Sequence, residues 1–176
     1  MATSPTAGLD LSRRRFSVDD YETMFGIGIL TEDDRVELID GEIVEMPPIG
    51  SLHASHVDKM AALLRRLEPS QALLRVQSPV ALRPDSQPEP DIALLKPRDD
   101  YYRDAHPTPE DIILIVEVAE TTAEFDRETK VPLYARHGVA ATWLVDLEKG
   151  RLELYEEPVD GEYTLIRRPP AATEIH

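Results

Sequence analysis

Two carboxylates stand in this chain where acidic side chains are unexpected. Asp91 directly precedes the apolar run 92–95, and Glu117 lies inside the aliphatic segment 112–118. Short runs rich in Ile and Val are typical of buried strands, and a charged side chain is seldom buried unless it is paired or binds a metal. Two carboxylates at neighbouring strand ends would make the oxygen-ligand site that Mg²⁺, or Mn²⁺ in its place, prefers. The simpler interpretation is that Asp91 caps a turn and Glu117 is exposed at a strand end.

A lysine follows these carboxylates on a predicted helix. The pattern over residues 124–137 is helical, and Asp126 and Lys130 are four residues apart, so they share one side of that helix. As a surface pair they would do little, and Lys130→Ala would leave folding nearly intact. In the preceding strand, alternation places Glu117 on the face that also carries Ile113, Ile115 and Ala119, and the opposite face carries Ile112, Leu114, Val116 and Val118.

The segments around these residues resemble one known family. Pro90-Asp91, followed by a strand that carries Glu117, resembles the PD-(D/E)XK nuclease superfamily, although Ala119 occupies the lysine position of that motif. The stretches RVELIDGEIVEM, GSLH, EPDIALL, IVEVAETT, DRETKVPLYARHGV and WLVD are similar to those of the Uma-two family, formerly a domain of unknown function and described as putative restriction endonucleases. The resemblance runs from about residue 16 to about residue 155.

This resemblance implies a set of roles. It implies a metal held by Asp91 and Glu117 with the backbone carbonyl of Val118, and catalytic help from Lys130 in place of the superfamily lysine. It also assigns the upstream acid of the site to Glu37, which on residue type alone could be one more solvated acid of an acidic hairpin. The implied reaction is hydrolysis of DNA phosphodiester bonds by metal-activated water. Such enzymes often act as homodimers, so a homodimer is also expected.

Two histidines lie close together in H-A-S-H. His53 matches the single histidine of the family's GxxH segment, and its simpler interpretation is a residue at a helix start with no special role. His53 and His56 are three residues apart and could bind Zn²⁺, but no third ligand lies nearby in the sequence.

The charge of the chain argues against strong binding of nucleic acid. The formal net charge is −15, and residues 32–45 hold seven acids against Arg35 alone. Proteins that hold phosphate backbones usually present a basic face. A local basic surface could still come from Arg65, Arg66, Arg75 and Arg83. We therefore expect weak or transient DNA binding, and a catalytically silent acidic binding module that keeps the nuclease fold stays open as the alternative.

Composition and hydropathy bound the fold class. The 176 residues are 41% hydrophobic and 30% charged and contain no cysteine, as expected for a soluble globular domain without disulfides. Neither a membrane-spanning run nor the apolar core of a signal peptide is present, so the default expectation is a cytoplasmic protein. The predicted organisation is a flexible tail over 1–15, one restriction-endonuclease-like domain over 16–168, and a C-terminal tail over 169–176.

The predicted elements give an α+β domain with a mixed central sheet flanked by helices. A helix capped by Ser17 precedes a hairpin over 36–46 with an Asp-Gly turn. A second helix covers 51–67, and a polar loop covers 96–110. Beyond the helix at 124–137, strands are expected at 73–82, 91–95, 111–118, 142–146, 151–156 and 163–167.

Overall fold

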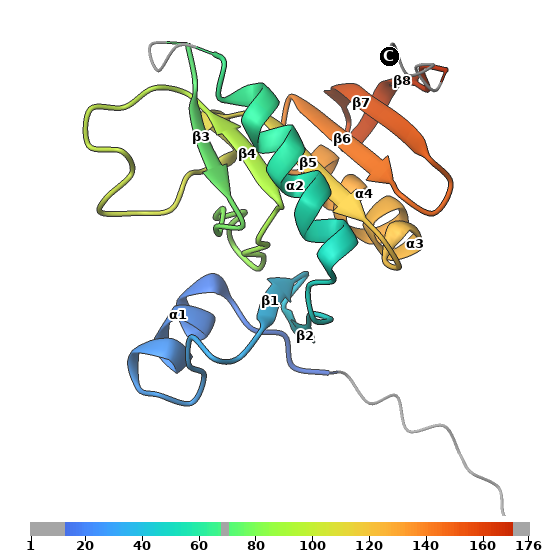
Figure 1. Cartoon of the computed structure of the whole chain (residues 1–176). Coiled ribbons are helices and arrows are strands. Elements are labelled where there is room, and N and C mark those ends of the chain that lie inside the picture. The colour runs from blue at the N-terminus through green and yellow to red at the C-terminus, as the bar shows by residue number, and fades with distance from the viewer. Residues whose placement is uncertain (1–12, 68–70, 171–176) are drawn as a thin grey trace, which may run out of the picture.

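The computed structural model describes residues 13–67 and 71–170, whose strands form two sheets (Figure 1). A two-stranded hairpin consists of β1 (Val36–Ile39) and β2 (Glu42–Glu45). A six-stranded sheet has the order β3-β4-β5-β6-β7-β8. Its strands are Leu73–Val76 (β3), Ile92–Leu95 (β4), Ile112–Ala119 (β5), Ala141–Asp146 (β6), Arg151–Val159 (β7) and Glu162–Arg167 (β8). The predicted α+β class is confirmed.

The helices lie on both sides of the large sheet. In Figure 1, α2 (Ser51–Leu64) crosses one face, and the helices between β5 and β6 lie behind the other. The helical segment behind the sheet consists of α3 (Ala123–Phe125), the π-helix η2 (Asp126–Lys130) and α4 (Val131–Arg136). It connects the parallel pair β5 and β6, whereas the other neighbours in the sheet are antiparallel. A short 3₁₀ turn, η1 (Pro109–Asp111), precedes β5.

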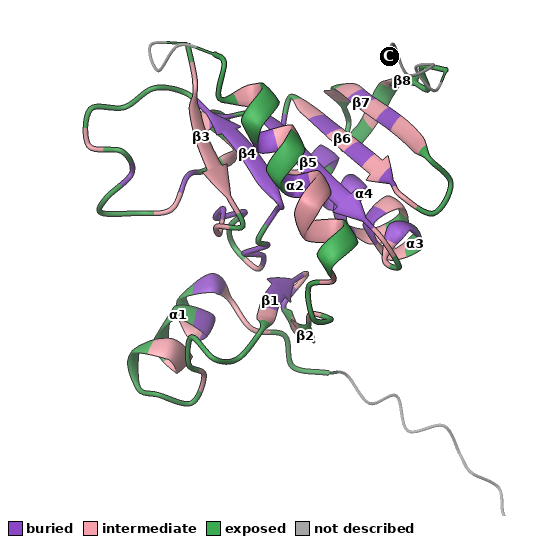
Figure 2. Ribbon diagram, viewed as in Figure 1, coloured by how far each residue is buried: buried purple, intermediate pink, exposed green. Residues whose placement is uncertain are grey.

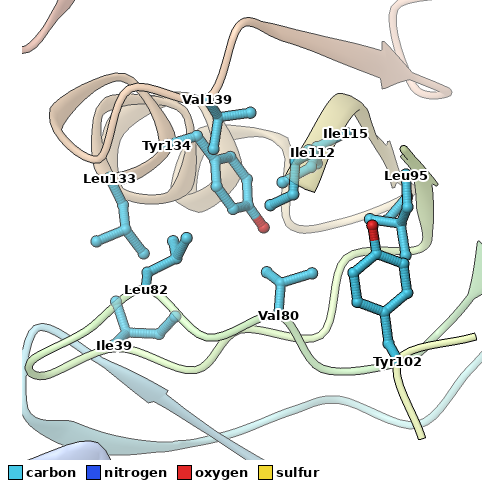
Figure 3. Packing of buried hydrophobic residues seen from close by; sticks show 11 residues of the cluster. Ile39, Val80, Leu82, Leu95, Tyr102, Ile112, Ile115, Leu133, Tyr134 and Val139 are labelled. Carbon is cyan, nitrogen blue, oxygen red and sulfur yellow. The ribbon is translucent and has the colours of Figure 1, made fainter. Parts of the chain in front are cut away.

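Two apolar layers hold the helices on the sheet. One layer joins Val57 and Ala61 of α2 to β4 and β5. The other packs Leu133 and Tyr134 of α4 against Ile115 of β5 (Figure 3). Figure 2 shows β4 and most of β5 as buried. Because β5 is covered on both faces, a polar group that points inward from it is shielded from bulk water.

The N-terminal region forms as its local signals predict. Ser17 and Asp20 make a reciprocal capping box at α1 (Val18–Gly26). Asp40 and Gly41 have φ values of 48° and 77°, the left-handed backbone that a tight two-residue hairpin turn requires. Gln87 N–H donates to the Leu38 carbonyl, which attaches the hairpin to the segment before β4. The hairpin is thereby held beside the start of β4.

Three local predictions are wrong. The strand expected over 73–82 ends at Val76, because Gln77 has a φ of 45° and the chain turns there. The alternation expected in β5 fails at its first two residues, because a bulge in the pairing with β4 leaves Ile113 exposed and places Ile112 in the core cluster of Ile115. The helix expected over 124–137 is α-helical only at its two ends.

Two other expectations concern the chain ends and membranes. Residues 1–12 and 171–176 lie outside the described part of the chain, so the assignment of tails stays a prediction. The chain is attached to the hairpin from Phe16 onward, where the Phe16 N–H donates to the Gly41 carbonyl at 2.9 Å. Within residues 13–67 and 71–170, no helix has both the length and the apolar character needed to cross a membrane.

Candidate active site

A pocket of about 280 Å³ lies where the β1-β2 hairpin, the start of α2, the start of β4, the end of β5 and the η2 turn meet. Its lining includes all five residues expected from the sequence to form the site. These are Glu37, Asp91, Glu117, Val118 and Lys130. The structure therefore brings together side chains that are up to 93 positions apart in the chain.

Asp91 and Glu117 meet across two paired strands. In the antiparallel register, Ile92 of β4 lies opposite Val116 of β5, which places Asp91 opposite Glu117. Asp91 Oδ2 accepts a hydrogen bond of 2.9 Å from Val118 N–H. Both acids are buried, at 8% and 3% exposure. The interpretation in which Glu117 is exposed at a strand end is therefore wrong, and Asp91 accepts a hydrogen bond from the neighbouring strand β5.

The second oxygen of Asp91 is held by side chains from two other segments. His53 Nε2, in the first turn of α2, lies 2.8 Å from Asp91 Oδ1, and Gln77 donates to the same oxygen at 3.2 Å. The hydrogen bond to Asp91 raises the pKa of His53, although burial opposes the change. His53 thus belongs to the site. His56 lies 2.9 Å from the Leu52 carbonyl instead, so the two histidines do not form a Zn²⁺ pair.

Glu117 is enclosed by hydrogen-bond donors on one side. Its Oε1 accepts a 2.6 Å hydrogen bond from the Tyr134 hydroxyl and lies 3.4 Å from Lys130 Nζ. Burial raises the pKa of Glu117 to about 8, although the Lys130 charge opposes this change. Burial, together with the nearby Glu117 charge, also raises the pKa of Tyr134 well above its ordinary value, so Tyr134 remains a hydrogen-bond donor.

Lys130 is a buried cation at the centre of the acids. Its Nζ lies 3.0 Å from Glu37 Oε1, and the residue is 1% exposed. Burial lowers the pKa of Lys130, but Glu117, Glu37 and Asp126 outweigh it and raise the pKa above its ordinary value. Lys130 therefore remains charged at neutral pH. The expected surface pair with Asp126 is not formed, because the partners of Lys130 are Glu37 and Glu117.

A π-helical turn positions Lys130. Val131 N–H donates to the Asp126 carbonyl five residues back, which widens the turn. Pro132 follows immediately, and proline lacks the N–H of an α-helical ladder and clashes with the carbonyl four residues earlier. The turn places both Asp126 and Lys130 in the pocket wall. π-Helical turns are rare in proteins overall, but those that occur often lie at functional sites.

A second buried network anchors this turn to the sheet. Arg127 donates to Glu153 at 2.6 Å and to Asp146 at 3.0 Å, and both carboxylate side chains are 0% exposed. Glu153 is on β7 and Asp146 ends β6. Arg127, three residues before Lys130 in η2, is thus tied to two strands, which limits how far Lys130 can move.

Glu37 reaches the site from the hairpin. Its Oε1 accepts a 2.7 Å hydrogen bond from Glu89 N–H as well as the bond from Lys130. Its Oε2 is buried and, among the described residues, has no hydrogen-bond partner. A buried oxygen without a donor is costly unless water or a cation satisfies it. The interpretation of Glu37 as a solvated acid of the hairpin is wrong.

The comparisons with known proteins identify the family and the fold. The sequence model of the Uma2 family, described as "Putative restriction endonuclease", matches residues 18–175. The chain belongs to the Uma2 family. The fold is also that of a solved relative described as a putative nuclease belonging to DUF820 from Anabaena variabilis. That structure has a TM-score of 0.65 and 14% sequence identity, covering 89% of this chain and 87% of that one. No curated protein sequence matches the chain.

The packing around Ala119 in this Uma2 protein leaves little space for a lysine at that position. Ala119 is fully buried and packs with Ala123, Val131, Leu144 and Tyr155. A lysine at this position would have to displace those side chains, which is destabilising in a packed core. Lys130 instead enters from η2 and brings its ammonium group to Glu117.

The residues of the pocket fit a magnesium ion. Mg²⁺ is usually bound through one or two carboxylates, with water and substrate phosphate as further ligands. Asp91 and Glu117 supply two carboxylates, and the unpartnered Oε2 of Glu37 offers a further acceptor. Within the described ranges, no three His, Cys, Asp or Glu side chains already form a metal-binding group. The carbonyl of Val118 as a ligand stays a prediction.

Three contributors were not assigned to the site from sequence. Tyr134 lies in an apolar helical stretch, and Gln77 lies in a segment expected to be strand, so neither gave a signal. For Asp126, the sequence pattern indicates only that it shares a helix side with Lys130. It is 4% exposed, lines the pocket and accepts a 2.7 Å bond from Thr122. Burial raises the pKa of Asp126, while Lys130 and Thr122 oppose the change.

Proposed function

We propose that this protein is a Mg²⁺-dependent, endonuclease-like phosphodiesterase that hydrolyses DNA, with Mn²⁺ able to replace Mg²⁺. The observation that carries the proposal is the arrangement of Asp91 opposite Glu117 with Lys130 Nζ 3.4 Å from Glu117, all in one pocket. Two carboxylates with an adjacent cation suit the metal-dependent hydrolysis of a phosphodiester. Membership of the Uma2 family supports a nuclease-like function.

Each residue then has a defined task. Asp91 and Glu117 would hold the metal ion, which supplies a nucleophilic water at neutral pH and polarises the phosphate. Tyr134 and Val118 N–H orient the two carboxylates through hydrogen bonds to one oxygen of each. Lys130, fixed by Glu37, would orient the attacking water and stabilise charge that develops on the phosphate. His53 holds the remaining oxygen of Asp91.

A second candidate function is a catalytically silent acidic binding module. Two observations favour it: both oxygens of Asp91 already accept hydrogen bonds, and the protein carries a formal charge of −15. In this case the fold and the hydrogen-bond network would persist without hydrolysis, and the acidic surface would repel DNA at low salt.

The test is cleavage of supercoiled plasmid and of a labelled oligonucleotide in Mg²⁺ or Mn²⁺, beside EDTA. Asp91→Asn is the decisive variant, because it keeps an oxygen acceptor for Val118 N–H while removing the charge. Asp104→Asn is the matched control, since Asp104 is exposed and lies outside the pocket. The proposal requires metal-dependent cleavage by wild type and Asp104→Asn, and its loss in Asp91→Asn. Cleavage by none of the three, with all of them folded, supports the binding module.

The expected homodimer is part of the same proposal. Two active sites are needed to cut both strands at once, so a dimer would convert supercoiled plasmid directly to linear DNA. Light scattering of the purified protein, combined with the order in which nicked and linear products accumulate, tests this point.

A further inference from the structure

The charges that line the pocket present a problem for a phosphate substrate. Among the described residues, six acidic side chains line the pocket, and its lysine and arginine side chains are Lys130 and Arg35. The six are Glu37, Glu89, Asp91, Glu117, Glu120 and Asp126. The Lys130 charge is already shared by Glu37 and Glu117 at 3.0 and 3.4 Å. A phosphate that approaches the mouth therefore needs a further cation.

Arg35 has the position such a cation requires. It directly precedes β1, and its carbonyl accepts a 2.8 Å hydrogen bond from Met46 N–H, which fixes the backbone at the open end of the hairpin. Side chains two apart on a strand share one face and are separated by roughly 7 Å. Arg35 thus extends the row that contains Glu37. Glu37 is 1% exposed and Arg35 is exposed, so the row runs from the pocket interior to its mouth.

The Arg35 side chain is also free to bind. Among the described residues, its guanidinium makes no hydrogen bond and no ion pair, although 34 acidic residues are present in the sequence. Two other exposed arginines are engaged, in contrast: Arg83 pairs with Asp19 at 2.6 Å, and Arg136 pairs with Asp40 at 2.8 Å. Burial and the Glu37 charge raise the pKa of Glu89, and the charges of Lys130 and Arg35 oppose this change. Arg35 therefore lies near enough to Glu89 to act on its charge.

The arginines first suggested by the sequence do not fill this role. None of Arg65, Arg66, Arg75 and Arg83 lines the pocket. Arg75 donates to the Tyr101 carbonyl at 3.1 Å. Any contacts that these four arginines make with DNA would therefore lie outside the pocket. At the mouth of the pocket, the arginine available to contact a phosphate is Arg35.

We propose that Arg35 is a substrate-binding residue that holds a phosphate of the nucleic acid at the mouth of the pocket. This inference rests on the proposed function and identifies how an acidic nuclease-like site retains its polyanionic substrate. The planar guanidinium offers donors in a fork that matches two phosphate oxygens and is always charged. Because the contact is made by an exposed side chain outside the carboxylate cluster, it strengthens binding of substrate and transition state alike. It therefore acts on KM and not on kcat.

The first experiment is steady-state cleavage of a labelled oligonucleotide in Mn²⁺ by wild type, Arg35→Ala, Arg35→Lys and Arg103→Ala. Arg103 is the matched control, because it is an exposed arginine outside the pocket. A charge-assisted hydrogen bond corresponds to about a tenfold to hundredfold change in affinity. Arg35→Ala should raise KM by about that factor with kcat within about twofold. Arg35→Lys should recover part of the loss, and Arg103→Ala should match wild type.

Three results would contradict this inference and favour a simpler explanation. If Arg35 only balances the acids of the hairpin, Arg35→Ala lowers the melting temperature and leaves KM unchanged, which overturns the inference. An equal rise in KM for Arg103→Ala also overturns it, because the effect would then be general electrostatics. A fall in kcat without a change in KM is a third contrary result.

Direct binding distinguishes failure of this inference from failure of the proposed function. Fluorescence anisotropy with a labelled oligonucleotide is measured on Asp91→Asn and on Asp91→Asn/Arg35→Ala. Suppose that wild type never cleaves but the double variant binds the oligonucleotide at least about tenfold more weakly than Asp91→Asn. The inference on Arg35 is then confirmed, and the proposed hydrolytic function is not. If wild type cleaves and the two variants bind equally, only the Arg35 inference fails. If the protein neither cleaves nor binds the oligonucleotide, the proposed function and the Arg35 inference both fail.

Discussion

Tyr134 donates a buried hydrogen bond of 2.6 Å to Oε1 of Glu117. The hydroxyl comes from α4 and the carboxylate from β5, so helix packing sets the orientation of a proposed metal ligand. Both residues are almost fully buried, and Lys130 approaches the same oxygen at 3.4 Å. With Oε1 engaged in this way, the carboxylate has a defined orientation before any ion binds. Preorganisation of this kind usually matters for metal affinity.

Tyr134→Phe should therefore weaken metal binding while preserving the packing of the ring. Loss of a group that orients a ligand typically costs about tenfold to a hundredfold in metal affinity or activity. Titration with Mn²⁺ by calorimetry measures the change. Tyr155→Phe is the control, because that hydroxyl donates to Glu153 outside the pocket. Equal Mn²⁺ affinities for Tyr134→Phe and wild type would show that the bond does not orient a ligand.

Metal affinity should rise with pH because Glu117 must lose a proton to bind a cation. Burial raises the pKa of Glu117 to about 8 from an ordinary 4.5. Release of one proton makes the affinity increase about tenfold per pH unit below about pH 8 and level off above it. Calorimetric titration with Mn²⁺ at several pH values measures this slope. A flat profile would mean that Glu117 is not a ligand.

The same pKa predicts how the metal-free protein responds to pH. A raised pKa in the folded state means that the protonated acid favours folding. Its contribution to the free energy of unfolding is full below the unfolded pKa of 4.5 and is lost as pH rises through about 8. Glu117→Gln should remove this part of the decline. Denaturant unfolding in EDTA, from about pH 5 to about pH 9, compares the two proteins. Parallel pH profiles would contradict the assignment.

Most elements could be predicted because their signals are local. The Asp-Gly turn of the hairpin, the Ser17 cap and the apolar runs of β4 and β5 each depend on a few adjacent residues. The convergence of Asp91 and Glu117 could also be predicted, since both adjoin short strands that are neighbours in sequence. These features supply most of the site.

What could not be predicted depends on contacts between distant segments. The bulge at Ile113 arises from pairing with β4, and the η2 turn arises from Pro132 together with the anchoring of Arg127. The burial of Lys130 follows from its contacts with Glu37 of the hairpin and Glu117 of β5. Helix spacing alone suggested an exposed pair with Asp126, because sequence periodicity carries no information on which elements cover that face.

Arg127 should contribute to stability in a pH-dependent way. Burial alone would raise the pKa of Glu153, but hydrogen bonds from Arg127, Tyr155 and Arg168 lower it to about 2. A lowered pKa gives a contribution to stability that is full above the unfolded pKa of 4.5 and is lost as pH falls through about 2. Arg127→Met should thus be most destabilising at neutral pH, with a smaller effect toward about pH 3. Denaturant midpoints across this range test the trend, with Arg103→Met as the control. A penalty independent of pH would point to lost packing alone.

Lys130 should contribute strongly to stability, contrary to the expectation for a surface lysine. Removing this buried cation leaves Glu37 without its ion-pair partner, and breaking a buried ion pair typically costs about 3–5 kcal/mol. Lys130→Met, which keeps the apolar stem, should lower the free energy of unfolding by about this amount. Denaturant unfolding measures it, with Lys59→Met on the exposed side of α2 as control. The double variant Lys130→Met/Glu37→Gln should recover part of the loss, because it removes a stranded charge. A single variant within about 0.5 kcal/mol of wild type would mean that the acids are neutral without Lys130. Since these variants change stability as well as chemistry, cleavage by Lys130→Met is meaningful only at temperatures where it remains folded.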